Sequence, residues 1–349
     1  MKDAGHRDAI DAALRFEKTD RTPVNNFTIV TAARSAGVLV KDARYEPELS
    51  AKLSIDFALK TKSDFVKPIV DSQIPFIDLG MDVYMPDDDY GRVRSTYISD
   101  LSEVDDIAFF DPKKASECPH FDRCILQALT ATEKALPEDL HICGLSWGPI
   151  STAGYLMGTE DLIFSLMMGE EAGVRKLIEK CAVFVAEQEK AQIDAGASVM
   201  WMADPTSSED IIAPDMFKTA LSGTSLAISS VKKEYSDVLS FLHVCGNTKD
   251  LIPLIPETGA DCFSFDHAVD PAVAREAAGK KVPLMGNIDP VKYIMNGDPA
   301  SIRKESFRII EACGAEGGLI LAPGCETPIS SPDENVLAMC QAGRDYWKQ

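Results

Sequence analysis

The sequence lacks any long hydrophobic run. No stretch of about 18 consecutive apolar residues occurs, so no segment is expected to span a membrane. The first eight residues, Met1 to Asp8, are polar and resemble the start of a helix, without the apolar core of a signal peptide. We therefore expect a cytoplasmic protein with no membrane partner.

Positive charge is also scarce. The chain has 35 Lys and Arg residues against 55 Asp and Glu residues, which gives a formal net charge of -20 and a pI near 4.6. Such a chain is poorly suited to the phosphate backbone of nucleic acids, so we expect no nucleic-acid partner. An acidic surface is compatible with a protein partner that has a basic docking face.

A disulfide framework is missing as well. The nine cysteines are scattered over 349 residues without regular spacing, which indicates free thiols in a reducing compartment. Six of them have no matching partner residues and are expected to be small packing side chains. These six are Cys118, Cys124, Cys181, Cys262, Cys313 and Cys340.

Short apolar runs alternate with longer amphipathic stretches from one end of the chain to the other. The runs predict strands near 24–30, 64–70, 140–145, 198–203, 239–245, 261–266, 282–287 and 318–322. Residues 170–194 have no proline and predict a long helix, residues 207–210 resemble a helix start, and residues 330–334 open a final helix.

Eight strands that alternate with helices over this length predict a (β/α)₈ TIM barrel, with residues 1–349 as a single domain. A doubly wound sheet is the alternative, but no Gly-x-Gly-x-x-Gly turn follows the first expected strand. Residues 71–120, rich in proline and acidic turns, are expected to form an insertion after the second strand. Two short strands are possible within it, around 82–84 and 92–98.

Ligand-type side chains occur where the expected strands end. Active sites of such barrels are built at the C-terminal ends of several strands. We therefore expect a site that gathers these side chains, with Asp204, Asp266 and Asn287 as candidate catalytic residues. The full set is Asp204, His243, Cys245, Asp266, Asn287 and Cys325.

His243, Cys245 and Cys325 form a candidate zinc site. His243 and Cys245 are two apart on a strand and point to the same face, and Cys325 follows another strand. Three protein ligands leave a fourth position open for chemistry. Two thiolates and a neutral imidazole balance the charge of Zn²⁺, which suits alkyl transfer to sulfur better than hydrolysis. The similar pair His141 and Cys143 has no third partner and is interpreted as ordinary core residues.

The two aspartates allow more than one interpretation. Asp204 and Asp266 could be paired carboxylates for acid–base chemistry, as in glycoside hydrolysis. Alternatively, Asp204 begins a turn before Pro205, and Asp266 caps the segment that follows it. Its place beside the candidate zinc ligands favours a role for Asp266 in the chemistry of the site over a purely structural one.

Several motifs together resemble the uroporphyrinogen decarboxylase superfamily, and most closely its methylcobamide:coenzyme M methyltransferases. The resemblance implies a (β/α)₈ barrel with Zn²⁺ on His243, Cys245 and Cys325. It further implies that Asp266, where that branch has a glutamate, is a displaceable fourth ligand. The motifs are Asp20-Arg21-Thr22-Pro23-Val24, Gly148-Pro149-Ile150-Ser151-Thr152-Ala153, His243-Val244-Cys245-Gly246-Asn247, Gly286-Asn287-Ile288 and Leu321-Ala322-Pro323-Gly324-Cys325.

The activity that this resemblance implies is transfer of a methyl group from a methylated corrinoid to a small thiol. The methylcorrinoid would be bound to a separate corrinoid carrier protein, and coenzyme M would be the thiol. Residues 25–34 lack the arginine-rich motif of the decarboxylases, which disfavours porphyrin decarboxylation. No cluster of Lys or Arg near the site indicates a sulfonate pocket, which makes coenzyme M the weakest part of the implied activity.

Three alternatives remain open from the sequence. One is a corrinoid-linked methyltransferase with another donor or acceptor, such as a methoxylated compound, a methylamine or tetrahydrofolate. The second is a lyase of the uroporphyrinogen decarboxylase type, which would need no metal. The third is a zinc-binding or corrinoid-binding protein without enzymatic activity.

Overall fold

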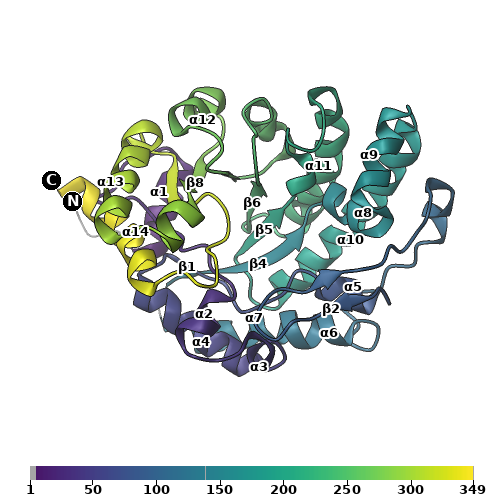
Figure 1. Ribbon diagram of the computed structural model, residues 1–349, viewed down its shortest axis with the longest axis horizontal. Coiled ribbons are helices and arrows are strands. Elements are labelled where there is room, and N and C mark those ends of the chain that lie inside the picture. Colours follow the sequence, from purple (N-terminus) through teal and green to yellow (C-terminus); the bar gives the residue numbers. More distant parts are fainter. Residues whose placement is uncertain (1–4, 138, 349) are drawn as a thin grey trace.

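The computed structural model describes residues 5–137 and 139–348. Its centre is a curled parallel sheet of seven strands in the order β1-β4-β5-β6-β7-β8-β9, with helices packed around it (Figure 1). The strands are β1 (Phe65–Val66), β4 (His141–Trp147), β5 (Val199–Ala203), β6 (Leu239–Val244), β7 (Cys262–Phe265), β8 (Leu284–Ile288) and β9 (Leu319–Pro323). The expected α/β barrel architecture is confirmed.

Val24 joins the two edges of this sheet. It forms an isolated parallel bridge with Leu321 of β9. On its other side, the carbonyl oxygen of Val24 accepts a hydrogen bond of 2.9 Å from the backbone N–H of Asp64, directly before β1. One residue therefore occupies the place where an eighth strand would close the barrel.

The expected strand over residues 24–30 is thus wrong beyond its first residues. The side chain of Asn25 accepts a hydrogen bond of 2.7 Å from the backbone N–H of Phe27, and Phe27 has a φ of 41°. This side-chain contact competes with a strand ladder, because it turns the backbone away from its neighbours. The chain here becomes a loop that brings Phe27 to the mouth of the barrel.

A buried ion pair holds the closing residue at the opposite end of the barrel. The carboxylate of Asp64 accepts hydrogen bonds from the Val24 N–H at 2.7 Å and from the Arg21 guanidinium at 2.7 and 2.8 Å. Burial raises the pKa of Asp64, but hydrogen bonds from His6 and Arg21 outweigh it and leave the pKa below its usual value. The carboxylate therefore stays charged and tied to Val24.

The helices are α1 (His6–Leu14), α2 (Thr31–Ser35), α3 (Val40–Arg44), α4 (Pro47–Thr61), α5 (Ile74–Asp78), α6 (Pro119–Phe121), α7 (Gln127–Ala135), α8 (Pro149–Met157), α9 (Thr159–Met167), α10 (Glu171–Asp194), α11 (Phe217–Glu234), α12 (Pro271–Ala278), α13 (Pro299–Ile309) and α14 (Asp333–Asp345). Figure 1 shows them on the outside of the sheet. Within the described ranges, none is both long and apolar enough to cross a lipid bilayer.

Helix α10 confirms the helix expected over 170–194. Its buried residues Val174, Leu177, Ile178, Cys181 and Val185 recur every three or four positions, so one face packs inward against α8 and α11. Helix α14 likewise confirms the final helix. The helix start expected at 207–210 is wrong, because only a single 3₁₀ turn forms at Pro205–Ser207 and α11 begins at Phe217.

The segment 71–120 lies between β1 and β4. It contains α5 and an antiparallel hairpin of β2 (Val83–Tyr84) and β3 (Arg92–Val93), which confirms the two short strands expected there. The hairpin lies outside the seven-stranded sheet. Its turn carries Tyr90, which lines the cavity described below.

Candidate functional site

Three candidate metal ligands converge at the C-terminal ends of two strands. His243 lies in β6, Cys245 follows that strand, and Cys325 follows β9. The Nε2 atom of His243 lies 3.0 Å from the Sγ of Cys245, which lies 3.4 Å from the Sγ of Cys325. Among the described residues this is the single group of three His, Cys, Asp or Glu side chains whose ligand atoms lie within 4.8 Å of one another.

The geometry of this cluster fits a tetrahedral zinc ion. With Zn–S bonds of about 2.3 Å and Zn–N bonds of about 2.0 Å, tetrahedral edges measure roughly 3.5–3.8 Å. The observed spacings of 3.0 and 3.4 Å are slightly shorter than these edges. No rearrangement of the backbone is needed for the three side chains to hold one ion.

The orientation of the His243 ring is fixed from the neighbouring strand. The register between β6 and β7 pairs His243 with Ser264, and the Ser264 hydroxyl lies 2.9 Å from Nδ1 of the ring. Nε2 is therefore the nitrogen that faces the two sulfurs. Partners of this kind set the tautomer of a metal-binding histidine.

The contact between the two thiols shifts their pKa values in opposite directions. A hydrogen bond from Cys245, together with one from His243, lowers the pKa of the Cys325 thiol. The same contact with Cys325 is the main cause that raises the pKa of Cys245, with burial and the charge of Asp266 adding to it. The lowered pKa of Cys325 favours its thiolate, which is the form that binds metals.

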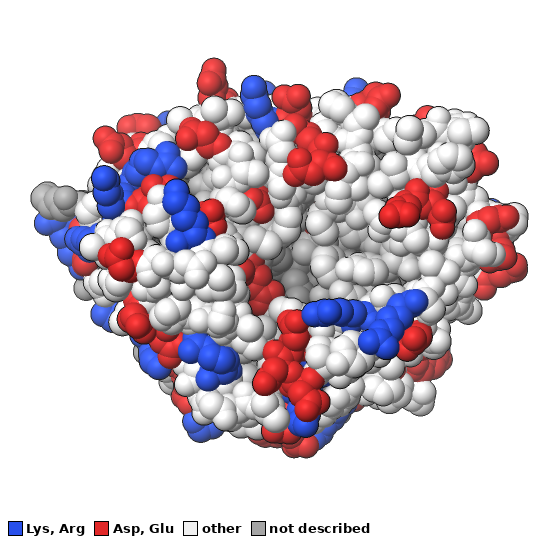
Figure 2. Space-filling view, viewed as in Figure 1, with Lys and Arg blue, Asp and Glu red and all other residues white. Residues whose placement is uncertain are grey.

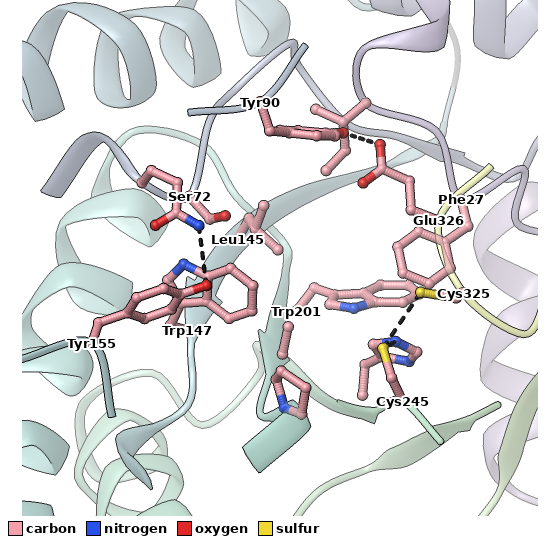
Figure 3. A pocket seen from close by; sticks show the side chains of 15 residues that line it. Phe27, Ser72, Tyr90, Leu145, Trp147, Tyr155, Trp201, Cys245, Cys325 and Glu326 are labelled. Atoms are coloured by element: carbon pink, nitrogen blue, oxygen red, sulfur yellow. Dashed lines mark hydrogen bonds between the residues drawn. The ribbon is translucent and has the colours of Figure 1, made fainter. Parts of the chain in front are cut away.

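An aromatic cavity of about 250 Å³ opens above the cluster. Figure 2 shows it as a hollow near the centre of the visible face, with much of its rim uncharged. Figure 3 shows the two sulfurs at one end and Trp147 and Tyr155 at the other. The aromatic residues among its lining are Phe27, Tyr90, Trp147, Tyr155 and Trp201.

Asp266 lies near the cluster but outside the group of three ligand atoms. Its side chain is buried, and Oδ1 accepts a hydrogen bond of 2.9 Å from the backbone N–H of Ala268. The same oxygen lies 2.7 Å from Nδ1 of His267. The carboxyl group is therefore held by its own loop, and its role as a fourth ligand stays a prediction.

Asn287 holds this loop in place. Its side-chain amide donates hydrogen bonds to the carbonyl oxygens of Asp266, at 3.0 Å, and Val269, at 2.7 Å. Asn287 itself is buried in β8 and does not line the cavity. These contacts place Asn287 beside the candidate site, where it positions the loop that carries Asp266. A catalytic role for Asn287 stays a prediction.

Asp204 does not face the cavity. Its carboxylate accepts a hydrogen bond of 2.9 Å from the backbone N–H of Ser151 and one of 3.3 Å from the hydroxyl of Thr224. Full burial raises its pKa to about 6. These contacts hold the first turn of α8, so they favour the alternative in which Asp204 is structural.

Two charged residues beside the cavity were not predicted from the sequence. Glu326 directly follows Cys325, accepts a hydrogen bond from the hydroxyl of Tyr90, and has a pKa raised to about 8 by burial. Lys67 is buried behind the rings of Trp201 and Phe27, with Nζ 4.1 and 4.6 Å from their centroids. A lone lysine in the apolar run 64–70 was the signal that could have indicated it.

The second His-x-Cys pair is separate from the metal cluster. Nδ1 of His141 lies 3.0 Å from the hydroxyl of Ser198, and burial lowers the pKa of His141 to about 4. Cys143 is fully buried in the barrel core. Both residues fit the interpretation as core side chains.

Comparisons with known proteins give relatives of two kinds. The chain is 30% identical to the methylcobamide:CoM methyltransferase MtbA of Methanosarcina acetivorans, over 64% of this chain and 63% of that protein. The chain thus spans less than two thirds of this relative's length. It is 25% identical to the methylcobamide:CoM methyltransferase MtaA of Methanosarcina barkeri, over 96% of both chains. Other relatives carry the name uroporphyrinogen decarboxylase.

The fold is similar to that of a solved methyltransferase from Methanosarcina mazei. The two chains superpose with a TM-score of 0.83 at 23% identity, over 99% of this chain and 100% of the other. The family model described as "Uroporphyrinogen decarboxylase (URO-D)" matches residues 6–346. The chain therefore belongs to the uroporphyrinogen decarboxylase (URO-D) family.

Proposed function

We propose that this protein is a zinc-dependent methyltransferase, which moves a methyl group from a methylated corrinoid to a small thiol. The carrying observation is the cluster of His243, Cys245 and Cys325 at one end of an aromatic cavity. The relatives named methylcobamide:CoM methyltransferase support the same reaction and make coenzyme M the first acceptor to test. The methylcorrinoid would arrive on a separate corrinoid carrier protein at the open mouth.

His243, Cys245 and Cys325 would hold the Zn²⁺. When bound, the ion would supply Lewis acidity that keeps a substrate thiol deprotonated at neutral pH. The two cysteine thiolates would balance the charge of the ion, so the substrate sulfur keeps its electron density. Ser264 fixes the His243 ring, and Asn287 holds the loop that carries Asp266.

The aromatic walls would exclude water from the reacting sulfur. Trp201 and Phe27 lie next to the His243 ring, with ring centroids 6.1 and 5.2 Å from it. In this dry setting the substrate sulfur attacks the methyl carbon, a sulfur–carbon bond forms, and the cobalt–carbon bond breaks with its electron pair left on cobalt. The thiol proton is released to solvent, which balances the reaction.

Metal analysis coupled to demethylation of methylcobalamin tests this proposal. The purified protein should bind about one zinc ion per chain, as one three-ligand site implies. His243→Ala, Cys245→Ala and Cys325→Ala should each lose the zinc or abolish demethylation, whereas Cys143→Ala should retain both. Full zinc content with unchanged demethylation in Cys325→Ala would contradict the proposal.

Uroporphyrinogen decarboxylation is less well supported by the cavity. Its substrate carries several carboxylates, and Arg34 is the one arginine within residues 25–34. The Arg34 guanidinium donates to the carbonyl oxygen of Ile329 and to the carboxylate of Asp333, each at 2.8 Å, and does not line the cavity. An assay of decarboxylation in metal-free protein separates the two activities.

A further inference from the structure

The cavity offers no positive charge to an anionic substrate. None of its 15 lining residues, all within the described part of the chain, is a lysine or an arginine. One of them, Glu326, is acidic, and most of the others are aromatic or aliphatic. Burying an anion without a cationic partner costs several kcal/mol in such an environment.

The nearest buried cation is shielded from the cavity. Lys67 is 7% exposed and is not a lining residue. The rings of Trp201 and Phe27 lie against its ammonium group and belong to the cavity wall. A ligand in the cavity therefore meets the two rings and not the ammonium.

Lys67 is also balanced by an acid. Burial lowers the pKa of Lys67, and the nearby carboxyl of Glu326 opposes that shift. Burial likewise raises the pKa of Glu326, and the Lys67 charge opposes it.

Like the Lys67 ammonium, the unpartnered polar atoms of three cavity-lining residues are buried. The indole N–H groups of Trp147 and Trp201 and the side-chain oxygen of Gln73 have no hydrogen-bond partner among the described residues. The Gln73 nitrogen donates to the Tyr155 hydroxyl at 3.2 Å. These atoms have almost no accessible surface, so the surface that a ligand meets in the cavity is largely aromatic and aliphatic.

We propose that the acceptor thiol of this enzyme has an uncharged remainder, largely apolar or aromatic, and that the cavity discriminates against anionic thiols such as coenzyme M. This inference rests on the proposed thiol methyltransferase function. Its basis is the aromatic lining with no cation, and the burial of the Lys67 ammonium against the rings of Trp201 and Phe27. Apolar pockets with few neutral polar groups recognise ligands of this class.

A series of thiols that differ in one group tests the inference. The series is HS–CH₂–CH₂–X with X as hydroxyl, phenyl, ammonium or sulfonate, assayed with zinc-loaded protein and methylcobalamin. We expect kcat/KM for the hydroxyl and phenyl thiols to exceed that for the sulfonate by about tenfold or more. A sulfonate equal to or better than the hydroxyl thiol, or an ammonium thiol better than both neutral ones, overturns the inference.

Two variants test which residues determine the selectivity between neutral and anionic thiols. Lys67→Met should lower the rates with all thiols by a similar factor. A rate that falls for the sulfonate thiol alone would show that Lys67 binds anions, which contradicts the inference. Ser72→Arg adds a cation to the cavity lining and should raise the ratio of sulfonate to hydroxyl use. Circular dichroism and zinc content verify that both variants are folded.

Binding measurements keep this test independent of turnover. The methyl thioethers CH₃–S–CH₂–CH₂–X can be titrated into the zinc-loaded protein by calorimetry. If no thiol is methylated, the proposed function fails, and the order of thioether affinities still decides the inference. Tighter binding of the phenyl and hydroxyl thioethers supports it, and tighter binding of the sulfonate thioether overturns it.

Discussion

Ser264 is the residue that gives the candidate metal centre its orientation. Its hydroxyl contacts Nδ1 of His243, so Ser264→Ala should free the ring to rotate and to change tautomer. We expect a loss of zinc affinity of about 10-fold to 100-fold, measured by competition with a chromophoric chelator. Ser240→Ala is the matched control, since the buried Ser240 hydroxyl has no hydrogen-bond partner among the described residues. Equal affinities in the two variants would contradict the role of Ser264.

Asp204 predicts a pH dependence of stability. Its folded pKa of about 6 lies above the ordinary value of 3.8, so the folded state binds the proton more tightly than the unfolded state. The stability that this group contributes is fully present below pH 3.8 and is lost as the pH rises through 6. The shift corresponds to at most about 3 kcal/mol, at 1.36 kcal/mol per pKa unit.

The variant Asp204→Asn isolates that contribution. Its amide oxygen can still accept from the Ser151 N–H, but it does not titrate. Chemical denaturation between about pH 4 and pH 7 should show wild-type stability rising relative to the variant as the pH falls. Parallel pH profiles of the two proteins would show that Asp204 does not titrate in this range.

For individual residues, the sequence predicted the three candidate metal ligands better than the residues around them. His243, Cys245 and Cys325 were predictable because strand alternation and strand ends place them together, and the structure brings them together. Asp204 has the same position at a strand end, but its carboxylate contacts α8, a tertiary contact without a local pattern. The sequence around Lys67 does not indicate the rings that cover it, because Phe27 and Trp201 come from distant segments.

At the level of the secondary-structure elements, α14 packs closely against the closing residue Val24. A Cβ added at Gly343 would lie 2.3 Å from a methyl carbon of Val24 and 3.1 Å from the carbonyl oxygen of Thr22. Gly343→Ala should therefore push Val24 from its bridge with Leu321 and destabilise the protein by about 1–3 kcal/mol.

A double variant identifies the cause of that loss. In Val24→Ala/Gly343→Ala the smaller side chain leaves room for the new methyl group, so the combined loss should be smaller than the sum of the two single losses. A coupling energy of about 0.5 kcal/mol or more in thermal or chemical denaturation is expected for residues in contact. Additive losses would show that Gly343 does not act through Val24.

Element boundaries were predictable where the pattern is long. The helix expected over 170–194 is α10, because 24 residues without proline give several turns of one buried face. The strand expected over 24–30 fails because the Asn25 side chain bonds to the backbone of Phe27. The helix start expected at 207–210 fails because Ser208 and Asp210 bond to loop backbone instead of capping a helix.

For the whole molecule, the net charge of -20 opposes compaction. Screening should weaken this repulsion, because the Debye length falls from about 30 Å at 0.01 M salt to about 10 Å at 0.1 M. We expect the Tm in calorimetry to rise over this range in both NaCl and KCl, which excludes an effect of one ion. A Tm that falls with salt would indicate that attractive ion pairs dominate.

The closure of the barrel at Val24 has a consequence for the order in which the chain folds. The backbone around the closing loop is held by the far end of the sequence, since Thr327 donates its hydroxyl to the carbonyl oxygen of Asn26, 301 residues earlier. During synthesis this contact cannot form until Thr327 has left the ribosome. Contacts of such sequence separation form late and slowly. Phe27 on that loop and Cys325 after β9 both line the cavity, so the cavity is completed only when nearly the whole chain is present.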